Sequence, residues 1–252
     1  MNNILFGFIT SILAGLSTLL GFIIVNLKIK EENINNFICF CLAFSLSIMI
    51  SISIFDLIPT CFSNLFSSLG LIKSMLIFLL GIFCSYIILK LVNNIFISTN
   101  EVGELYKLGL LNMIVLIIHN LPEGIATFLS SYHSKKLGIK ISFAIMLHNI
   151  PEGIGISVPI YYATKSKKKA FIATLLSSLA EPCGAIFSFF FLKQFINEKM
   201  INIILILVAC LMITLSIEEI YPKAIKYNKG KYLILGLLLG VVLVIINLLL
   251  FN

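Results

Sequence analysis

Eight long apolar runs follow one another along this sequence, separated by short polar connections. A helix needs about 20 mostly apolar residues to cross the hydrocarbon core of a bilayer, and each run reaches that length. The chain is 60% hydrophobic and 12% charged, whereas a soluble domain is about 25% charged. The sequence therefore predicts an all-α integral membrane protein, with residues 1–252 forming a single polytopic domain. The eight transmembrane helices are expected at about 4–27, 37–59, 70–92, 108–132, 139–162, 170–192, 200–221 and 232–251.

The distribution of lysine predicts how these helices are oriented. All 18 basic residues are Lys, and cytoplasmic loops of membrane proteins carry an excess of positive charge. With the N-terminus outside, 12 Lys lie on the cytoplasmic side and 6 on the outer side. Both termini are therefore predicted to be extracytoplasmic, in a multi-pass protein of the cell (cytoplasmic) membrane. The net charge of +7 comes from lysines that are expected in loops beside the lipid bilayer. No nucleic-acid partner is therefore expected.

The hexapeptide HNLPEG at residues 119–124 returns as HNIPEG at 148–153, each in the middle of an apolar run. A charged side chain there costs at least ~2.5–3.5 kcal/mol, so two copies are hard to explain without a function. In each copy His and Glu are four positions apart and share one helix face, so both can reach one ion. The Asn follows the His by one residue and points to a neighbouring side of the helix, so its amide oxygen can serve an adjacent ligand position. The Pro removes a backbone donor, and the Gly lets another helix come close.

A further carboxylate, Glu181, lies at the midpoint of the predicted helix 170–192, at the same depth as both hexapeptides. Imidazole, carboxylate and amide oxygen together suit Zn²⁺, Fe²⁺, Mn²⁺, Co²⁺ and their mimic Cd²⁺. These ions are expected as transported substrates, and no resident cofactor is predicted. Seven ligands suffice for one roomy site or for two neighbouring ions. The candidate metal ligands are His119, Asn120, Glu123, His148, Asn149, Glu152 and Glu181.

Other polar residues in or beside the apolar runs leave alternatives open. Asp56, Glu218 and Glu219 lie near predicted helix ends, where they are either solvated capping groups or entrance and exit stations for a metal. Cys183 follows Glu181 by two positions and is either a packing residue or a soft ligand. His133 is expected to be a surface histidine.

A second repeat relates SIFDLIP at residues 53–59 to SIEEIYP at 216–222. Together the two repeats predict a 3+2+3 arrangement, in which helices one to three are related to helices six to eight and helices four and five form the central pair. In the predicted topology the second and seventh helices run in opposite directions, as an inverted repeat requires. Inverted repeats with a site at the midplane of the membrane are typical of transporters.

These motifs resemble the ZIP (Zrt/Irt-like) family of metal transporters, and its bacterial ZupT-type members most closely. The resemblance rests on HNLPEGIATF (119–128), HNIPEGIGISVPIY (148–161), SSLAEPCGA (177–185) and LSIEEIYPKA (215–224), and the eight-helix plan extends it over the whole chain. It implies uptake of divalent metal into the cytoplasm by alternating access through a two-metal site. It also implies a scaffold that dimerises, so a homodimer is a possible assembly.

This chain departs from the family pattern at two places. Some members carry Asp where this chain has Asn149, so the site is less negative and a tightly held second metal is in doubt. Many members carry a His-rich cytoplasmic loop between the third and fourth helices. The corresponding connection, expected at residues 93–107, has no histidine, so metal capture by that loop is not expected.

Two other classes of membrane protein could use buried metal ligands. A membrane-embedded metal hydrolase would use an HExxH motif or a set that includes Arg, and this chain has neither. A metal-gated channel or sensor stays open as an alternative, because it can use the same ligands. The sequence therefore predicts a carrier of divalent metals, Zn²⁺ before the others.

Overall fold

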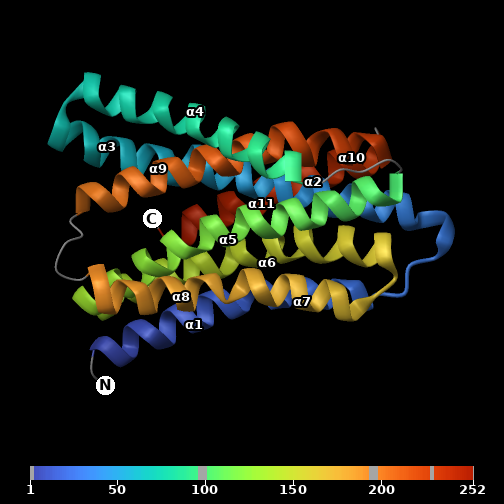
Figure 1. Ribbon diagram of the computed structural model, residues 1–252, viewed down its shortest axis with the longest axis horizontal. Helices are drawn as coiled ribbons and strands as arrows, with labels where there is room; N and C mark the ends of the chain where they lie inside the picture. The colour runs from blue at the N-terminus through green and yellow to red at the C-terminus, as the bar shows by residue number, and fades with distance from the viewer. Residues whose placement is uncertain (1–2, 96–100, 193–197, 228–229, 252) are drawn as a thin grey trace.

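The computed structural model describes residues 3–95, 101–192, 198–227 and 230–251, and every element assigned in them is helical. The long helices lie side by side along one common direction (Figure 1). The predicted all-α class is therefore confirmed. In chain order the elements are α1 (Asn3–Phe22), the 3₁₀ turns η1 (Ile23–Asn26) and η2 (Glu31–Asn33), α2 (Ile34–Ile52), the π turn η3 (Ser53–Leu57), α3 (Ile58–Leu69), α4 (Leu71–Ile95), α5 (Glu101–His133), α6 (Lys135–Thr164), α7 (Lys167–Ser178), α8 (Ala180–Phe187), the π turn η4 (Ser188–Leu192), α9 (Glu198–Leu215), the π turn η5 (Ser216–Ile220), α10 (Tyr221–Tyr227) and α11 (Lys231–Phe251).

Seven helical stretches within the described residues are long and apolar enough to cross a membrane. The eighth predicted segment, 232–251, is also helical as α11. Large apolar side chains face outward, as in α4, where Ile72 is 77% exposed and Phe83 61%. Such a surface needs lipid rather than water around it. The seven long stretches are Asn3–Asn26, Glu31–Leu69, Leu71–Val92, Gly103–Tyr132, Ile141–Thr164, Lys167–Phe191 and Asn202–Tyr227.

Two boundaries differ from the sequence-based prediction. The second helix was expected to end at residue 59, but α3 continues it to Leu69, where Gly70 ends it with a φ of +83°. Glycine adopts this left-handed conformation without the steric cost of a Cβ. The connection expected at 93–107 is largely helical, because α4 reaches Ile95 and α5 begins at Glu101. Polar residues in these stretches mark solvated helix ends rather than loops.

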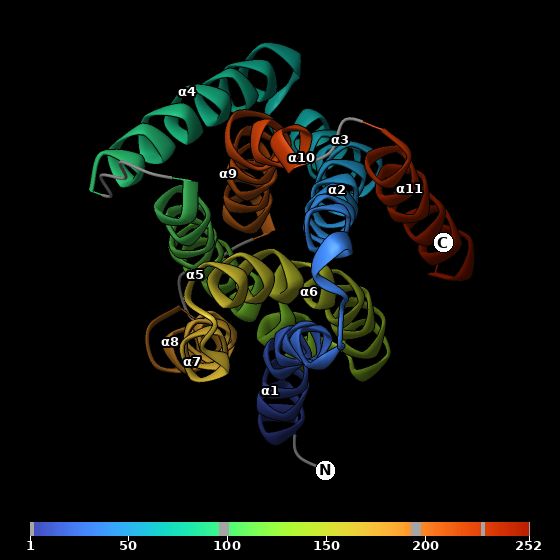
Figure 2. The ribbon, with the colours of Figure 1, turned by 90° about the vertical axis from the view of Figure 1, so that its right-hand side faces the viewer.

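The helices form two groups, seen most clearly along their axes (Figure 2). In the first group α6 packs along both α5 and α1, and α7 and α8 pack against α5 and α1. In the second group α11 packs along α2, and α4 packs along α9, with α3 and α10 completing it. The groups meet where α2 contacts α6 and α5 contacts α9. The largest apolar core lies at this junction and includes Leu111, Ile156 and Leu215, all fully buried.

The two copies of the second sequence repeat adopt the same local structure. Each copy forms a π turn, and a proline follows two residues after the turn ends. The turn η3 is followed by Pro59, and η5 is followed by Pro222. Proline lacks the N–H that would continue the helical hydrogen-bond ladder, and a π turn inserts one extra residue into it. Each copy also contacts the helix that leads into the other copy, η3 against α9 and η5 against α2. Ser53 Oγ lies 3.6 Å from Met212 Sδ, and Ser216 Oγ lies 3.9 Å from Met49 Sδ.

Candidate metal centre

Both HNxPEG hexapeptides lie inside continuous α-helices. The first is on α5 with Pro122 inside it, and the second is on α6 with Pro151 and Pro159 inside it. The helices continue through these prolines, which leaves backbone carbonyls one turn earlier without their helical donors. α5 and α6 pack along each other, so the two hexapeptides face a common region between the helices.

The centre of this region is a three-way contact around the imidazole of His119. Its Nε2 lies 3.2 Å from Glu123 Oε1 on the same helix and 3.3 Å from Glu152 Oε1 on α6. The His119 residue is 0% exposed, Glu152 1% and Glu123 2%. The predicted pairing of His and Glu four residues apart is therefore confirmed for the first hexapeptide. The tertiary structure adds the carboxylate of the second hexapeptide to the same cluster.

Asn149 and Glu181 form a second contact beside this cluster. The Asn149 amide nitrogen donates to Glu181 Oε1 on α8 and to the Ala14 carbonyl on α1, at 2.8 Å for the latter. Glu181 is fully buried and interacts electrostatically with Glu123, Glu152 and His119. Two neighbouring clusters therefore share one buried polar region.

Two glycines make this convergence possible. A Cβ built on Gly124 would collide with the backbone carbonyl of Glu181, and one built on Gly153 would collide with the carbonyl of Thr18 on α1. Only glycine lets the backbones approach this closely. The last residue of each hexapeptide thus brings α8 and α1 against the polar residues, as the sequence led us to expect.

The other two candidate ligands, Asn120 and His148, have no described contact with the two clusters. The Asn120 amide nitrogen lies 3.5 Å from the carbonyl of Ser177 on α7, and among the described residues Asn120 has no hydrogen bond to the His119 cluster. The side chain of His148 lies outside the described part of the structure. Its backbone is on α6 four residues before Glu152, on the same helix face. The two clusters therefore hold five of the seven predicted residues together.

Cys183, which the sequence left as either a packing residue or a soft ligand, is exposed on α8, whereas Glu181 is completely buried. Residues two positions apart on a helix point in different directions, so the thiol does not share the face of Glu181. Asp56, Glu218 and Glu219 lie in the π turns of the second helix group, outside the two clusters.

Sequence reasoning missed the contribution of α1. This helix has no His, Asp or Glu, yet its Ala14 carbonyl accepts the Asn149 amide. The signal that could have found it is a stripe of small residues. The buried residues of α1 are all small: Gly7, Thr10, Ser11, Ala14, Gly15, Ser17, Thr18 and Gly21. Such a face lets neighbouring helices pack closely in a membrane.

Several buried oxygens in this region have no hydrogen-bond partner among the described residues. They are Glu152 Oε2, Glu181 Oε2, Asn149 Oδ1 and Asn120 Oδ1. Leaving a buried acceptor unsatisfied costs about 1–3 kcal/mol, and more when it is charged. Four such acceptors in one region are typical of a site built to receive a cation.

The separations also fit a metal ion with nitrogen and oxygen ligands. Two ligand atoms at about 2.0 Å from a tetrahedral zinc ion lie about 3.3 Å apart, and the separations around His119 Nε2 are 3.2 and 3.3 Å. Within the described residues, no group of three or more His, Cys, Asp or Glu side chains is arranged to hold a metal ion as it stands. Side chains would therefore have to move before an ion is coordinated.

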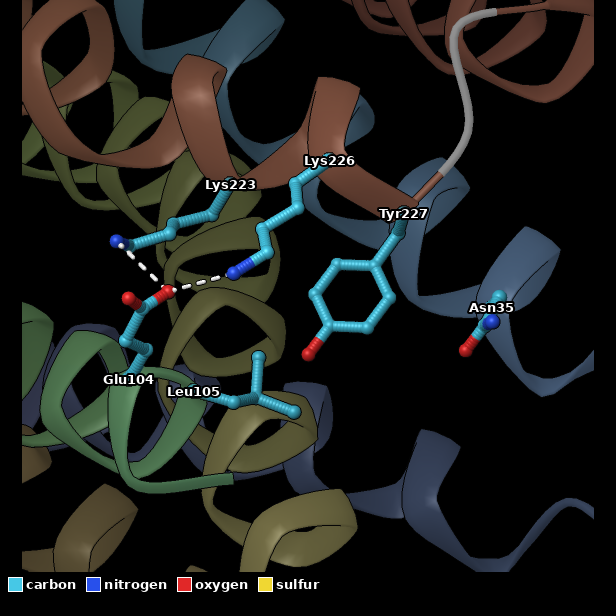
Figure 3. Close-up of a pocket in the computed structure, with 6 residues that line it drawn as sticks. All are labelled: Asn35, Glu104, Leu105, Lys223, Lys226 and Tyr227. Carbon is cyan, nitrogen blue, oxygen red and sulfur yellow. Dashed lines mark hydrogen bonds and ion pairs between the residues drawn. The ribbon is translucent and has the colours of Figure 1, made fainter. Parts of the chain in front are cut away.

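A separate polar cluster joins the two helix groups at the end of the bundle where α5 begins (Figure 3). Glu104 Oε2 on α5 lies 3.0 Å from Lys226 Nζ and 3.5 Å from Lys223 Nζ, both on α10. These residues line a cavity of about 110 Å³ together with Tyr227 and Asn35. The ion pairs therefore connect the helix that carries His119 to the other group.

A buried cluster of imidazole, carboxylate and amide groups between membrane-crossing helices is typical of the ion site of a membrane transport protein. Comparison with known proteins agrees with this class. The family model described as ZIP Zinc transporter matches residues 97–248. The zinc transporter ZupT of Clostridium perfringens is 34% identical, and the alignment covers 100% of this chain and 98% of that protein.

Two further relatives match over nearly their full lengths. The zinc transporter ZupT of Streptococcus mutans is 39% identical over 97% of each chain. That of Chlorobium chlorochromatii is 36% identical over 100% of this chain and 99% of its own. The chain belongs to the ZIP zinc transporter family. Its membership confirms the predictions of a multi-pass membrane transporter of the cell membrane and of a protein that is not an enzyme.

Proposed function

We propose that this protein carries divalent transition metal ions into the cytoplasm, Zn²⁺ foremost, with tolerance for Fe²⁺, Mn²⁺, Co²⁺ and Cd²⁺. The observation that carries the proposal is the buried contact of His119 with two carboxylates, Glu123 and Glu152. Borderline divalent metals prefer such nitrogen and oxygen ligands. The names of the curated relatives support zinc as the first substrate.

The ions would bind between α5, α6 and α8. His119, Glu123 and Glu152 supply the core of the site, and Asn149 and Glu181 lie beside them. His148 would join from α6, one turn from Glu152. Asn120 offers a buried carbonyl oxygen that is free of hydrogen bonds and would complete the set of seven ligands.

The proposed orientation places both termini outside the cell. α1 begins and α11 ends toward the same end of the bundle (Figure 1). The opposite end carries the longer series of lysines, which favours the cytoplasmic side. The reciprocal contacts of Ser53 with Met212 and of Ser216 with Met49 support the 3+2+3 plan with inverted repeats in a single domain.

Transport would proceed by alternating access. The six candidate ligands whose side chains the structure describes are almost completely closed to solvent, so an ion must enter and leave through a change of shape. All seven candidates belong to the group of α1 and α5–α8. That group would move against the group of α2–α4 and α9–α11, which would supply the dimer contact if the protein is a homodimer.

The test is uptake of radioactive zinc into proteoliposomes by the native chain and by Glu152→Gln and His148→Ala. Loss of a metal ligand is expected to lower uptake at least about 10-fold, the lower bound for groups that only support ligands. His133→Ala, at the end of α5, is the matched histidine control and should transport normally. Native uptake by variants that fold normally would contradict the proposed site.

The same assay also measures metal selectivity and distinguishes a carrier from a channel. Excess Mn²⁺, Fe²⁺ or Cd²⁺ as competitor ranks the selectivity of the site. Saturation of flux with zinc concentration distinguishes a carrier from a metal-gated channel. Uptake that rises without saturation would replace the carrier mechanism with a channel.

A further inference from the structure

The orientation of the Asn149 amide is fixed by its two neighbours. One of the atoms that it contacts is the Ala14 carbonyl oxygen, which can only accept a hydrogen bond. The other is Glu181 Oε1. The terminal atom of Asn149 that lies between these two oxygens must therefore be the donor nitrogen. Both of its hydrogens are used, one for each oxygen, and Asn149 Oδ1 is left without a hydrogen-bond partner.

Asn120 stands at the same place in the first hexapeptide but has different contacts. Its amide nitrogen lies 3.5 Å from the Ser177 carbonyl, and it has no hydrogen bond to a candidate ligand among the described residues. The two repeated asparagines therefore have different roles. Only Asn149 holds a carboxylate of the polar region.

The described candidate ligands divide into two sets. His119, Glu123 and Glu152 contact one another and can share one ion. A second ion would need Asn149 and Glu181, with Asn120 nearby. In this chain the Asn149 N–H group already supplies the positive partner of Glu181. A second cation beside Glu181 would meet the N–H group of Asn149 in place of a second carboxylate, and this donor group does not attract a cation.

We propose that the site holds a single divalent metal ion per chain, and that the Asn149 amide takes the place of a second ion beside Glu181. The inference rests on the proposed function, because it concerns the same site. It differs from the two-metal site that the family resemblance implies. Aspartate at residue 149 would have no N–H to offer, so two carboxylates would face each other and attract a cation between them.

The experiment is the stoichiometry of zinc bound to the purified full-length chain in detergent, measured by equilibrium dialysis and elemental analysis. The native chain is expected to bind one zinc ion, and Asn149→Asp is expected to bind two. Asn202→Asp is the matched control, because it adds the same charge on α9 outside both clusters, where its oxygen can still accept from Asn64 Nδ2. It should still bind one ion.

A double variant tests the place of the second ion. Adding Glu181→Gln to Asn149→Asp should return the count to one, because the second ion depends on that carboxylate. If Asn149→Asp does not fold, as judged by size-exclusion chromatography, Glu181→Gln alone remains informative and should keep one ion.

Each outcome decides the inference. A native chain that binds two ions, or a folded Asn149→Asp variant that binds only one, would overturn it while leaving zinc transport intact. Loss of the single ion in Glu181→Gln would also overturn it, because Glu181 would then hold that ion. A native chain that binds no zinc would overturn the proposed function as well.

Discussion

Each HNxPEG hexapeptide ends in a glycine that controls how closely another helix approaches the polar residues. At Gly153 the approaching group is the Thr18 carbonyl of α1, and at Gly124 it is the Glu181 backbone of α8. Both contacts involve backbone atoms, which cannot rotate away as a side chain can. A single methyl group at either position must therefore push a helix outward.

We expect Gly153→Ala to lower both stability and zinc uptake. Overpacking of a close contact typically costs about 1–3 kcal/mol, and the displaced α1 would carry the Ala14 carbonyl away from Asn149. Thermal unfolding in detergent and uptake in proteoliposomes measure the two effects. Gly81→Ala is the control, because its Cβ would meet only the side chains of Cys210 and Leu207. Equal behaviour of the two variants would show that the approach of α1 is unimportant.

Residue spacing predicted part of the polar region and could not predict the rest. The contact of His119 with Glu123 follows from their separation of four residues on one helix. The approach of Glu152 and the bond between Asn149 and Glu181 join different helices. These depend on how α5, α6 and α8 pack, which no local pattern specifies.

At the scale of the element, a proline in α6 leaves one backbone carbonyl without its helical hydrogen bond, and a side chain of α5 donates to that carbonyl instead. Pro159 has no N–H, so the Gly155 carbonyl four residues earlier has no helical donor. Asn112 Nδ2 donates to that carbonyl at 2.7 Å. Asn112 is 1% exposed, so water does not replace this bond. The pair therefore joins α5 to α6 beyond the hexapeptides.

We expect Asn112→Ala to destabilise the protein by about 1–3 kcal/mol, the cost of leaving a buried backbone acceptor without a partner. The measurement is the thermal unfolding midpoint in detergent. In a Pro159→Ala background the restored N–H of residue 159 can serve the Gly155 carbonyl, so Asn112→Ala should cost less there. The same cost in both backgrounds would contradict this role of Asn112.

The repeat SIFDLIP and SIEEIYP indicated related elements from a short match. Both copies form π turns, and the serine of each contacts a methionine of the helix that precedes the other copy. Proline near the end of each segment was visible in the sequence. The π turn itself was not, because it depends on which carbonyls find partners in the packed helix pair.

At the scale of the whole molecule, Glu104 and two lysines connect the helix groups at the end opposite the chain termini. Glu104 belongs to α5 in the first group, and Lys223 and Lys226 belong to α10 in the second. In the proposed orientation this is the cytoplasmic end. The ion pairs would have to open when the groups separate there, so they favour the closed state.

We expect Glu104→Gln to increase hydrogen–deuterium exchange of α10 by up to about five-fold at low salt. Exposed ion pairs contribute about 0.2–1 kcal/mol and are screened by salt, so the native chain at high salt should behave like the variant. Glu32→Gln is a control, since its contact with Lys30 lies within one short segment. Unchanged exchange in Glu104→Gln at low salt would show that the ion pairs do not hold the groups together.

The proposed orientation makes a separate prediction for two serines in neighbouring connections. In a cysteine-free background, Ser134→Cys between α5 and α6 should react with a membrane-impermeant thiol reagent in intact cells. Ser166→Cys between α6 and α7 should react only after the membrane is permeabilised. The opposite pattern would invert the orientation and the predicted sides of both termini.

The sequence by itself determined the membrane class, the family, the position of the helices and the polar residues of the candidate site. Apolar length, the doubled hexapeptide and lysine placement are local properties, so they can be read along one chain. Only the tertiary structure decided that Glu152 meets His119, that Asn149 holds Glu181, and that α1 closes the site through Ala14. These contacts join residues far apart in the chain, so they depend on how the helices pack, and Gly124 and Gly153 let α8 and α1 come close enough to take part.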